Sequence, residues 1–254
     1  MIFVSEAKEE NMAKIFIILI LGLVCSSQAV LVSTQLVNSN QINPNGMTVL
    51  GAVNTIFSGQ PTGGSVNGVL FEDAIWGNSK TLSTGALFYG DVSGDVRTAY
   101  TSSTISGTDA AALRRIADGI NFYNLDAKAC LTFSNLPANI AVQVQLITSD
   151  AAANIGNWSG IFSINTINSV NSAVTNMGSF QAGTEPNFYD AQLATFDALT
   201  DANGYLIVQI HQITSQHAGV AGIAVYAQVP ELSSMVFLSL FIGFLLLRGR
   251  NIIY

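Results

Sequence analysis

Two histidines near the end of the chain are the first residues that could do chemistry. His211 and His217 flank the stretch 212–216. Imidazole nitrogens bind zinc and transfer protons near neutral pH. A closed metal site needs more than two ligands, and Asp190 and Asp197 are carboxylates that the fold could add. Nothing in the spacing requires such a cluster, so the sequence favours exposed histidines at strand ends.

A second candidate is a calcium site. Oxygen-bearing side chains alternate at Asp91, Ser93 and Asp95, as ligands do in a calcium-binding loop. Val96 then occupies the position where an EF-hand needs glycine, and Ser102 the position of its bidentate glutamate. A solvated turn between strands is the favoured interpretation, with calcium as the alternative. The sequence predicts no other metal and no cofactor.

Aromatic residues in loop-like stretches could stack on a sugar ring. Aromatic faces pack on the apolar faces of sugars, while amides bind the hydroxyls. The stretch 154–159 combines Trp158 with Asn154 and Asn157 among turn-forming residues, so these three are the predicted ligand-binding residues. The alternative is that Trp158 packs at the edge of the core. The other candidates are Trp76, Tyr89, Tyr100, Phe188 and Tyr189, with Asn78 as a further amide.

Glycoside hydrolysis would need two carboxyl groups held a short distance apart in a cleft. Glu72, Asp73, Glu185 and Asp190 are acids that could contribute, but none lies in a motif that a hydrolase demands. The chain also has no glycine-rich phosphate loop between a strand and a helix, and no serine nucleophile elbow. No catalytic residue is therefore predicted, and a secreted hydrolase is the least favoured function.

The elements that would position these residues are mostly strands. Short apolar stretches separated by Gly, Ser, Thr and Asn predict a β-sandwich. In the segment 140–149, Val142 and Val144 alternate with Gln143 and Gln145, so one face is apolar and the other polar. Further strands are expected at 129–133, 159–167, 178–182, 193–196, 205–213 and 219–228, and with less alternation at 47–57, 65–71 and 85–92.

One helix is expected to interrupt this pattern. Thr108 could cap its start and Gly119 could end it. Leu113, Ile116 and Ile120 would share its apolar face. We expect this helix to close one end of the sandwich. No internal repeat recurs, which argues against a solenoid or a propeller.

The N-terminal residues have the order of a secretory signal peptide. A lysine precedes the apolar stretch 15–24, and small residues lead to Ala29, after which cleavage is expected. Acids outnumber bases before Met12, so translation is expected to start at Met12. Cys25 raises a lipoprotein as an alternative, but Val24 stands where a lipobox has a small residue.

The C-terminal residues predict a membrane segment. The sixteen residues 232–247 carry no charge and would span roughly 24 Å as a helix, against about 30 Å for a bilayer core. Interfacial serines and the stems of Arg248 and Arg250 could cover the difference. Those two arginines put the C-terminus in the cytoplasm and the segment 30–228 outside. The alternative is a buried core helix.

Between the terminal segments, residues 30–229 hold twelve acidic and five basic side chains, and their length suits one β domain. The resulting balance of minus seven repels phosphate backbones, which argues against nucleic acid as a partner. Cys130 is the only cysteine of this segment, so it forms no internal disulfide. Its apolar neighbours favour a buried thiol over a nucleophile.

Val229, Pro230 and Glu231 precede the apolar stretch, and Leu232 follows them directly. With the two arginines, the segment 229–254 resembles the PEP-CTERM sorting signal of Gram-negative bacteria, in which Val-Pro-Glu-Pro precedes an apolar helix and a short arginine cluster. Leucine here replaces the second proline. The resemblance implies recognition by an exosortase-type transpeptidase, which cuts near the motif and hands the protein to the cell surface or exopolysaccharide matrix.

A second resemblance concerns the domain itself, in the stretches 111–115, 131–136, 142–146, 177–182 and 221–226. Their order is similar to that of the jelly-roll domains common in PEP-CTERM proteins, which are related to galactose-binding-like and carbohydrate-binding modules. This resemblance implies a two-sheet sandwich and permits glycan binding.

The sequence thus predicts an all-β protein. A jelly-roll-like β-sandwich with one short helix at 30–228 is flanked by a signal peptide at 1–29 and a sorting signal at 229–254, which contains a transmembrane helix at 232–247. We expect a non-enzymatic protein that is exported across the inner membrane, is anchored there, and reaches the cell surface or extracellular matrix after processing.

The expected partners are the secretion machinery, an exosortase-type transpeptidase, the membrane and exopolysaccharide. A structural or adhesive protein that binds other proteins is the alternative function, followed by a secreted glycoside hydrolase.

Overall fold

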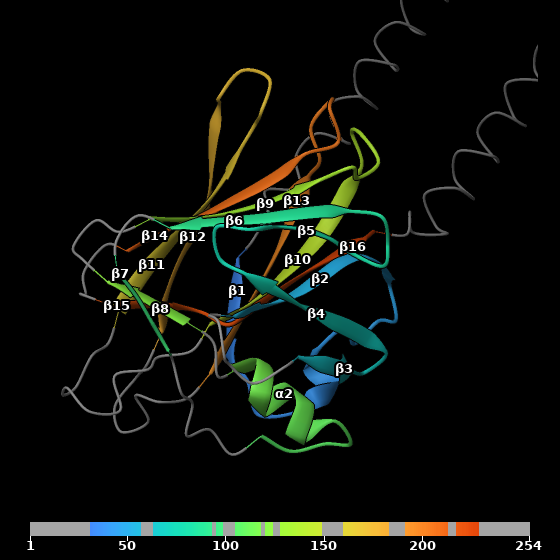
Figure 1. The fold of residues 1–254 in the computed structure, drawn as a ribbon, viewed down its shortest axis with the longest axis vertical. Coiled ribbons are helices and arrows are strands. Elements are labelled where there is room, and N and C mark those ends of the chain that lie inside the picture. The colour runs from blue at the N-terminus through green and yellow to red at the C-terminus, as the bar shows by residue number, and fades with distance from the viewer. Residues whose placement is uncertain are drawn as a thin grey trace, which may run out of the picture. The chain divides into compact units, whose positions relative to one another are not determined.

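The computed structural model of the 254-residue chain describes residues 31–56, 63–92, 95–98, 105–117, 120–123, 128–148, 160–182, 191–212 and 217–228. These residues belong to one compact unit, in which strands predominate (Figure 1). The predicted class is confirmed: the described chain is a two-sheet β-sandwich with one short α-helix.

The larger sheet has seven strands. Neighbouring strands run antiparallel except β2 and β4, which are parallel. Their spatial order is β1 (Val32–Gln35), β13 (Gln192–Leu199), β10 (Ala141–Thr148), β16 (Gly222–Ala227), β2 (Thr48–Ile56), β4 (Val69–Ile75) and β3 (Gly64–Val66).

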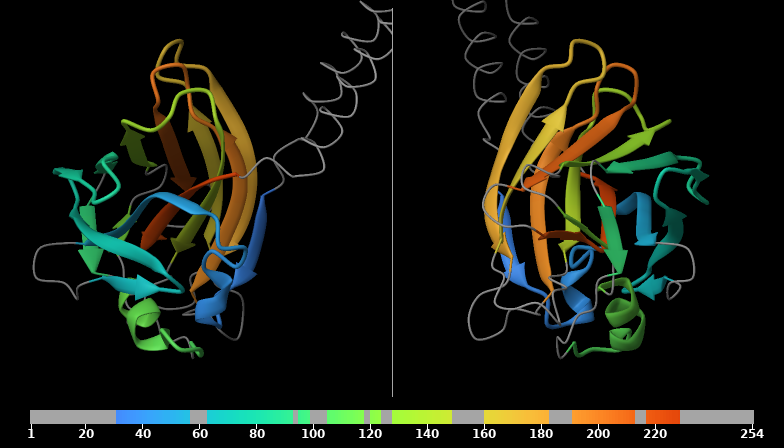
Figure 2. Two further views of the ribbon diagram at one scale, coloured as in Figure 1. Left: turned by 90° about the vertical axis from the view of Figure 1, so that its right-hand side faces the viewer. Right: turned by 60° about the vertical axis from the view of Figure 1, so that its left-hand side comes forward.

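The second sheet has six strands, all antiparallel to their neighbours. Its order is β12 (Val174–Ala182), β11 (Gly160–Ile167), β14 (Leu206–Gln212), β9 (Lys128–Ser134), β6 (Leu87–Val92) and β5 (Ser79–Thr81). Figure 2 shows β11 and β12 side by side, in gold. A small third sheet joins β15 (His217–Val220), β8 (Ile120–Tyr123) and β7 (Asp95–Thr98).

The core between the two large sheets is built by the alternation of side chains along each strand. In β9, Leu131 and Phe133 point inward and are fully buried. Phe133 meets Phe88 of β6 edge to face, with ring centroids 5.1 Å apart. A Cβ atom at Gly51 of β2 would come within 3.0 Å of the Phe133 ring and of Leu82, so glycine there lets the sheets approach.

A second core lies on the outer face of the seven-stranded sheet. It is covered by α2 (Ala110–Ala117), which packs beside β3 (Figure 1), and by the segment around η1 (Ser39–Gln41). A Cβ atom at Gly222 would lie 2.9 Å from Ile116 Cγ2, so a small residue in β16 lets the helix sit close. This core contains Leu36, Ile42, Ala52, Val66, Val69, Phe71, Ile105, Leu113, Ile116, Ala117, Ile147, Ala191, Leu193, Ala221, Ala224 and Tyr226.

Gln145 pairs with several polar groups inside the second core. The Tyr226 hydroxyl donates to Gln145 Oε1 at 2.9 Å, and the backbone N–H of Asn43 donates to the same oxygen at 2.9 Å. Gln145 Nε2 donates to the carbonyl of Gln41 at 2.9 Å. Burial raises the pKa of Tyr226, so this hydroxyl stays protonated. Gln145 thus fixes the segment around η1 to the sheet.

Two strand predictions are wrong in detail. The segment 65–71 is not one strand but the hairpin of β3 and β4, whose two-residue loop is Asn67-Gly68. Both loop residues have positive φ, 47° and 79°, as a type I′ turn requires. The segment 219–228 is also divided, because the chain leaves the three-stranded sheet at Val220 and enters the seven-stranded sheet at Gly222.

The predicted helix is confirmed, but its limits and its place are not. It begins at Ala110, two residues after Thr108, and Ile120 belongs to β8 rather than to the helix face. Gly119 lies outside the described residues. The helix covers the outer face of a sheet instead of closing the end of the sandwich, because Leu113 and Ile116 pack onto β-strand residues of that face.

Candidate functional site

The outer face of the six-stranded sheet is the candidate binding surface. In its central strands, buried residues that point to the core alternate with residues that solvent reaches. In β14, for example, Val208 and Ile210 are buried, whereas Ile207 and Gln209 are only half-buried. The half-buried residues of neighbouring strands therefore form one continuous surface.

A row of mostly polar side chains crosses this face, with one residue from each of five neighbouring strands. We name this set the amide row. Strand pairing aligns its members one after another, in the order Asp91, Cys130, Gln209, Asn165 and Asn176. With about 4.8 Å between neighbouring strands, the four steps of the row extend over roughly 19 Å.

The amides in this row are held by their neighbours but not saturated. Asn176 Nδ2 donates to Asn165 Oδ1 at 3.0 Å, and Gln209 Nε2 donates a weak hydrogen bond to Cys130 Sγ at 3.7 Å. Within the described residues, no partner bonds to Asn165 Nδ2 or to Gln209 Oε1. The row therefore offers one positioned donor and one positioned acceptor to a ligand.

A parallel row of more apolar side chains lies beside the amide row. We name this set the apolar row. Strand pairing aligns Tyr89, Thr132, Ile207, Ile167 and Val174. Its two ends are the most open, since Tyr89 is 38% exposed and Val174 is 60% exposed. The face thus combines hydrogen-bonding groups with an adjacent apolar strip.

Tyr205 is a second exposed aromatic residue on this face, and it was not predicted from the sequence. It directly precedes β14, is 37% exposed and, by alternation, points to the same side as Ile207. Its backbone N–H donates to Asp201 Oδ1 at 2.9 Å. The sequence pattern that could have identified it is alternation. Tyr205 lies two positions before Ile207 and four before Gln209, so the three side chains point to the same face of the sheet.

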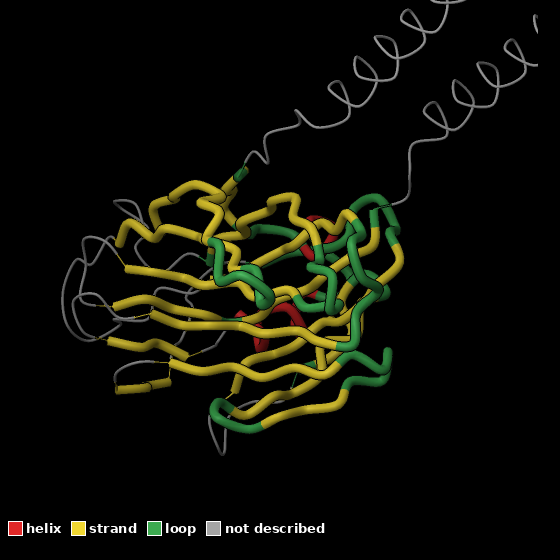
Figure 3. Tube along the Cα trace, turned by 90° about the horizontal axis from the view of Figure 1, so that it is seen from above, coloured by secondary structure: helices red, strands yellow, loops and turns green. Residues whose placement is uncertain are grey.

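Asp201 fixes the end of the sandwich where Tyr205 lies. Its Oδ2 accepts hydrogen bonds from the N–H of Ser169 at 2.9 Å and from the Ser169 hydroxyl, and its Oδ1 also accepts from Asn203 N–H. Desolvation raises the pKa of Asp201, but these hydrogen bonds outweigh it and hold the pKa below its usual value. Figure 3 shows most of the described loops, in green, gathered at one end of the strands.

Few charges lie on this face. Among the described strands of the six-stranded sheet, Asp91 is the charged member of the two rows, and Lys128 lies beyond them, paired across the strands with His211. The centre of the face is therefore neutral, and hydrogen bonds and apolar contacts are the interactions it can make.

The residues predicted first for ligand binding cannot be compared with this face. Trp158, Asn157 and Asn154 lie outside the described residues, as do Tyr100, Phe188 and Tyr189. The same holds for the cleavage residue Ala29 and for the sorting residues Val229, Pro230, Glu231, Arg248 and Arg250. All of these stay predictions.

The two remaining predicted aromatic residues, Tyr89 and Trp76, differ in their surroundings. A Cβ atom at Gly90 would lie 3.1 Å from the Trp76 ring, and Gly90 faces the core side of β6, opposite to Tyr89. The indole Nε1 of Trp76 is buried and has no hydrogen-bond partner among the described residues. Trp76 therefore packs at the edge of the core, while Tyr89 faces outward.

The residues of the calcium candidate are divided between two sheets. Asp91 lies near the end of β6 and Asp95 begins β7, while Ser93 lies outside the described residues. His211 and His217 also belong to different sheets, in β14 and β15. Within the described ranges, no group of three or more His, Cys, Asp or Glu residues could hold a metal ion.

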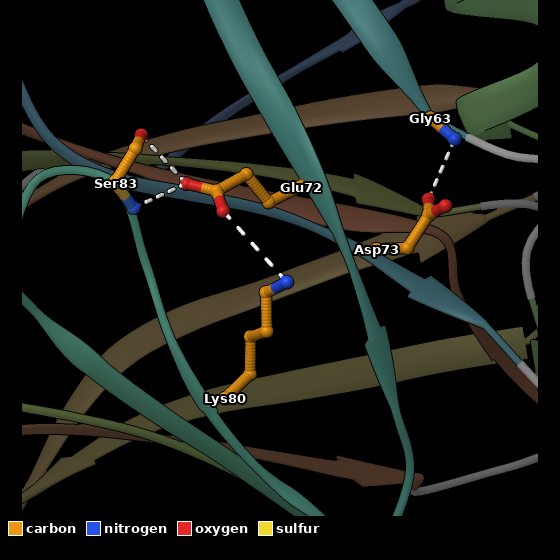
Figure 4. A network of polar contacts seen from close by, with 5 residues as sticks. All are labelled: Gly63, Glu72, Asp73, Lys80 and Ser83. Atoms are coloured by element: carbon orange, nitrogen blue, oxygen red, sulfur yellow. Dashed lines mark hydrogen bonds and ion pairs between the residues drawn. The ribbon is translucent and has the colours of Figure 1, made fainter.

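The adjacent acids Glu72 and Asp73 both hold chain segments together (Figure 4). Glu72 Oε1 accepts hydrogen bonds from the Ser83 N–H at 2.6 Å and hydroxyl at 2.8 Å, and Glu72 Oε2 lies 3.9 Å from Lys80 Nζ. Asp73 accepts from the N–H of Gly63 at 2.6 Å. Neighbours in a strand point to opposite faces, so these two carboxyl groups do not share a cleft.

Two further acids proposed for hydrolysis, Glu185 and Asp190, lie outside the described residues. The described part of the chain contains no helix that is long and apolar enough to cross a bilayer. The predicted membrane helix at 232–247 is outside that part.

Comparisons with known proteins give structural likenesses only. No protein-family model matches the chain, and the search of curated proteins gives no significant match. A family 35 carbohydrate-binding module from Abf62 of Cellvibrio japonicus is 14% identical, with a TM-score of 0.34 over 54% of this chain and 85% of that one.

The family 35 module from Clostridium thermocellum is also 14% identical, with a TM-score of 0.35 over 57% of this chain and 93% of that one. A plant complex of the peptide RALF23 with FER and LLG2 is 16% identical, with a TM-score of 0.40 over 72% and 41% of the two chains. The likeness to these structures is distant, so the site has to be interpreted from its own residues.

Proposed function

We propose that this protein is a non-enzymatic, exported β-sandwich that binds surface polysaccharide through the outer face of its six-stranded sheet. The observation that carries this proposal is the amide row beside the apolar row. Sugar rings present hydroxyls around their rim and apolar C–H groups on their faces, and a surface with both kinds of contact matches them.

The terminal segments support export as part of the proposal. Residues 1–29 have the order of a signal peptide, and residues 229–254 resemble a sorting signal with a membrane helix. Such a protein is delivered outside the inner membrane, is held there by the helix, and reaches the surface or matrix when an exosortase-type transpeptidase cuts near Glu231. Mass spectrometry of the mature protein tests this: an end near Pro230 supports processing, and an intact Tyr254 contradicts it.

A glycan array probed with the full-length protein in detergent, together with pull-down by native exopolysaccharide, tests the binding. We expect retention by at least one class of polysaccharide that is lost on heat denaturation. Absence of retention across all glycans would reject the binding part of the proposal.

An adhesive role is a second candidate, favoured by β12. This strand has nine residues, carries no charge and forms an edge of the six-stranded sheet. Exposed edges offer unpaired backbone groups to strands of other proteins. Crosslinking on intact cells distinguishes the two functions, because it would capture protein neighbours through β12 in the second case and polysaccharide in the first.

A further inference from the structure

We propose that the ligand of the outer face is a neutral, extended polysaccharide chain that lies across the strands, along the boundary between the amide row and the apolar row. This inference rests on the proposed function and specifies the site, the direction and the chemical class of the ligand.

The length of the two rows indicates an extended ligand. Both rows cross the same five strands, from β6 to β12, and each extends over roughly 19 Å at about 4.8 Å for each strand step. A single sugar would touch only one or two members of each row. A chain of several sugars would use the whole boundary and gain contacts with each added unit.

Two polar atoms of the amide row indicate hydroxyl groups as their partners. Among the described residues, Asn165 Nδ2 has no acceptor and Gln209 Oε1 has no donor, while their other amide atoms are held by Asn176 and Cys130. A sugar hydroxyl both donates and accepts, so one type of group satisfies both atoms. Because the amides are already positioned, little side-chain freedom is lost on binding.

The apolar row supplies the second half of the interaction. Tyr89 is 38% exposed at one end of this row, and Tyr205 is 37% exposed nearby on the same face. Their rings can cover the C–H faces of sugars whose hydroxyls reach the amide row. Ile207 and Ile167 continue the apolar strip toward β12.

The charge distribution indicates a neutral polymer. Neither row contains a cation that could pair with a uronate, sulfate or phosphate group, and the charges at one end of the face, Asp91 and Lys128, have opposite signs. The surrounding segment 30–229 carries twelve acids against five bases. An anionic polymer is therefore disfavoured, and binding of a neutral one is expected to change little with salt.

The test uses the full-length protein in detergent. Affinity electrophoresis and calorimetry measure its binding to neutral glucans and mannans of graded length, and to polygalacturonate as the charged polymer. We expect a neutral polymer to bind, with affinity that rises with chain length and stays constant as salt increases. Asn165→Ala and Gln209→Ala should each weaken binding about 3- to 10-fold, the equivalent of one hydrogen bond. Tyr89→Ala should weaken it by a similar or larger factor.

Asn40→Ala is the matched control, because Asn40 is an exposed amide of η1, which covers the outer face of the seven-stranded sheet and lies outside both rows. Its binding should equal that of the unchanged protein, and all variants should keep its melting temperature. Normal binding by Asn165→Ala and Gln209→Ala, with loss in Trp158→Ala, would overturn this inference while polysaccharide binding itself stands. Preference for polygalacturonate would also overturn it. No binding to any glycan would reject the proposed function as well.

Discussion

The two large sheets differ in what lies on their outer faces. On the seven-stranded sheet, α2 and the segment around η1 cover the outer face, and side chains such as Ile147 and Tyr226 are fully buried there. On the six-stranded sheet, the described outer residues are largely half-buried or exposed, and amides and hydroxyls are frequent among them.

This difference shows how polar groups are used on each face. In the covered face, Gln145 bonds to three separate groups, because a buried amide without partners would cost free energy. In the open face, Asn165 and Gln209 each keep one polar atom without a partner in the described chain. On the covered face, polar groups bond to one another and stabilise the fold. On the open face, the described chain leaves polar atoms that a ligand can bond to.

The largest effect is expected from a charge placed on the covered face. Ile116→Asp should destabilise the protein by about 4 kcal/mol or more, because it buries an unpaired carboxylate against β16. Thr132→Asp, the matched change on the open face, should cost about 1 kcal/mol or less. Chemical denaturation measures both, and equal losses would contradict the difference between the faces.

Replacing one glutamine on each face should give a smaller difference in the free energy of unfolding. Gln145→Ala should cost about 2 to 3 kcal/mol, because the Tyr226 hydroxyl, Asn43 N–H and Gln41 carbonyl lose a partner. Gln209→Ala should change the free energy of unfolding by about 0.5 kcal/mol or less. A large loss in the second variant would mean that the amide row is structural.

Acid should weaken the end of the sandwich that positions Tyr205. The folded-state pKa of Asp201 is lowered from its ordinary value of 3.8, so its contribution to stability is complete above that value and is lost as pH falls through the lower folded pKa. Asp201→Asn should remove this part of the acid dependence. Melting temperatures of both proteins from neutral pH to below 3.8 measure it, and parallel curves would refute the assignment.

The smallest effect is expected at the edge where the two sheets meet. Lys80 is 41% exposed and its Nζ lies 3.9 Å from Glu72 Oε2, so solvent screens the pair. Lys80→Ala should change stability by about 0.5 kcal/mol or less. A much larger loss in urea denaturation would show that this ion pair, rather than the Ser83 hydrogen bonds of Glu72, joins the sheets.

The sequence patterns that carried the fold prediction are local ones. Alternation in 140–149 identified β10, and the spacing of Leu113 and Ile116 identified α2. The same approach missed the hairpin at Asn67-Gly68, although this dipeptide is a strong turn signal, because the flanking apolar residues were assigned to one strand.

The candidate face could not be predicted in the same way. The amide row takes its residues from strands that are far apart in sequence, and their neighbours are set by long-range pairing. Tyr89 was identified as an aromatic that could contact sugar, but Trp76 received the same assignment and packs at the core edge. The place of the Trp76 ring over Gly90, its buried Nε1 and the exposure of Tyr89 separate the two, and each depends on the tertiary structure.

The pairing of β16 also has a kinetic consequence. This strand lies between β10 and β2, and Thr48 pairs with Ala227, which is 179 positions later in the chain (227 minus 48). Loops of such length close slowly. Strand β2 therefore meets its antiparallel partner only after residue 227 has been synthesised, so the seven-stranded sheet cannot be completed before that point.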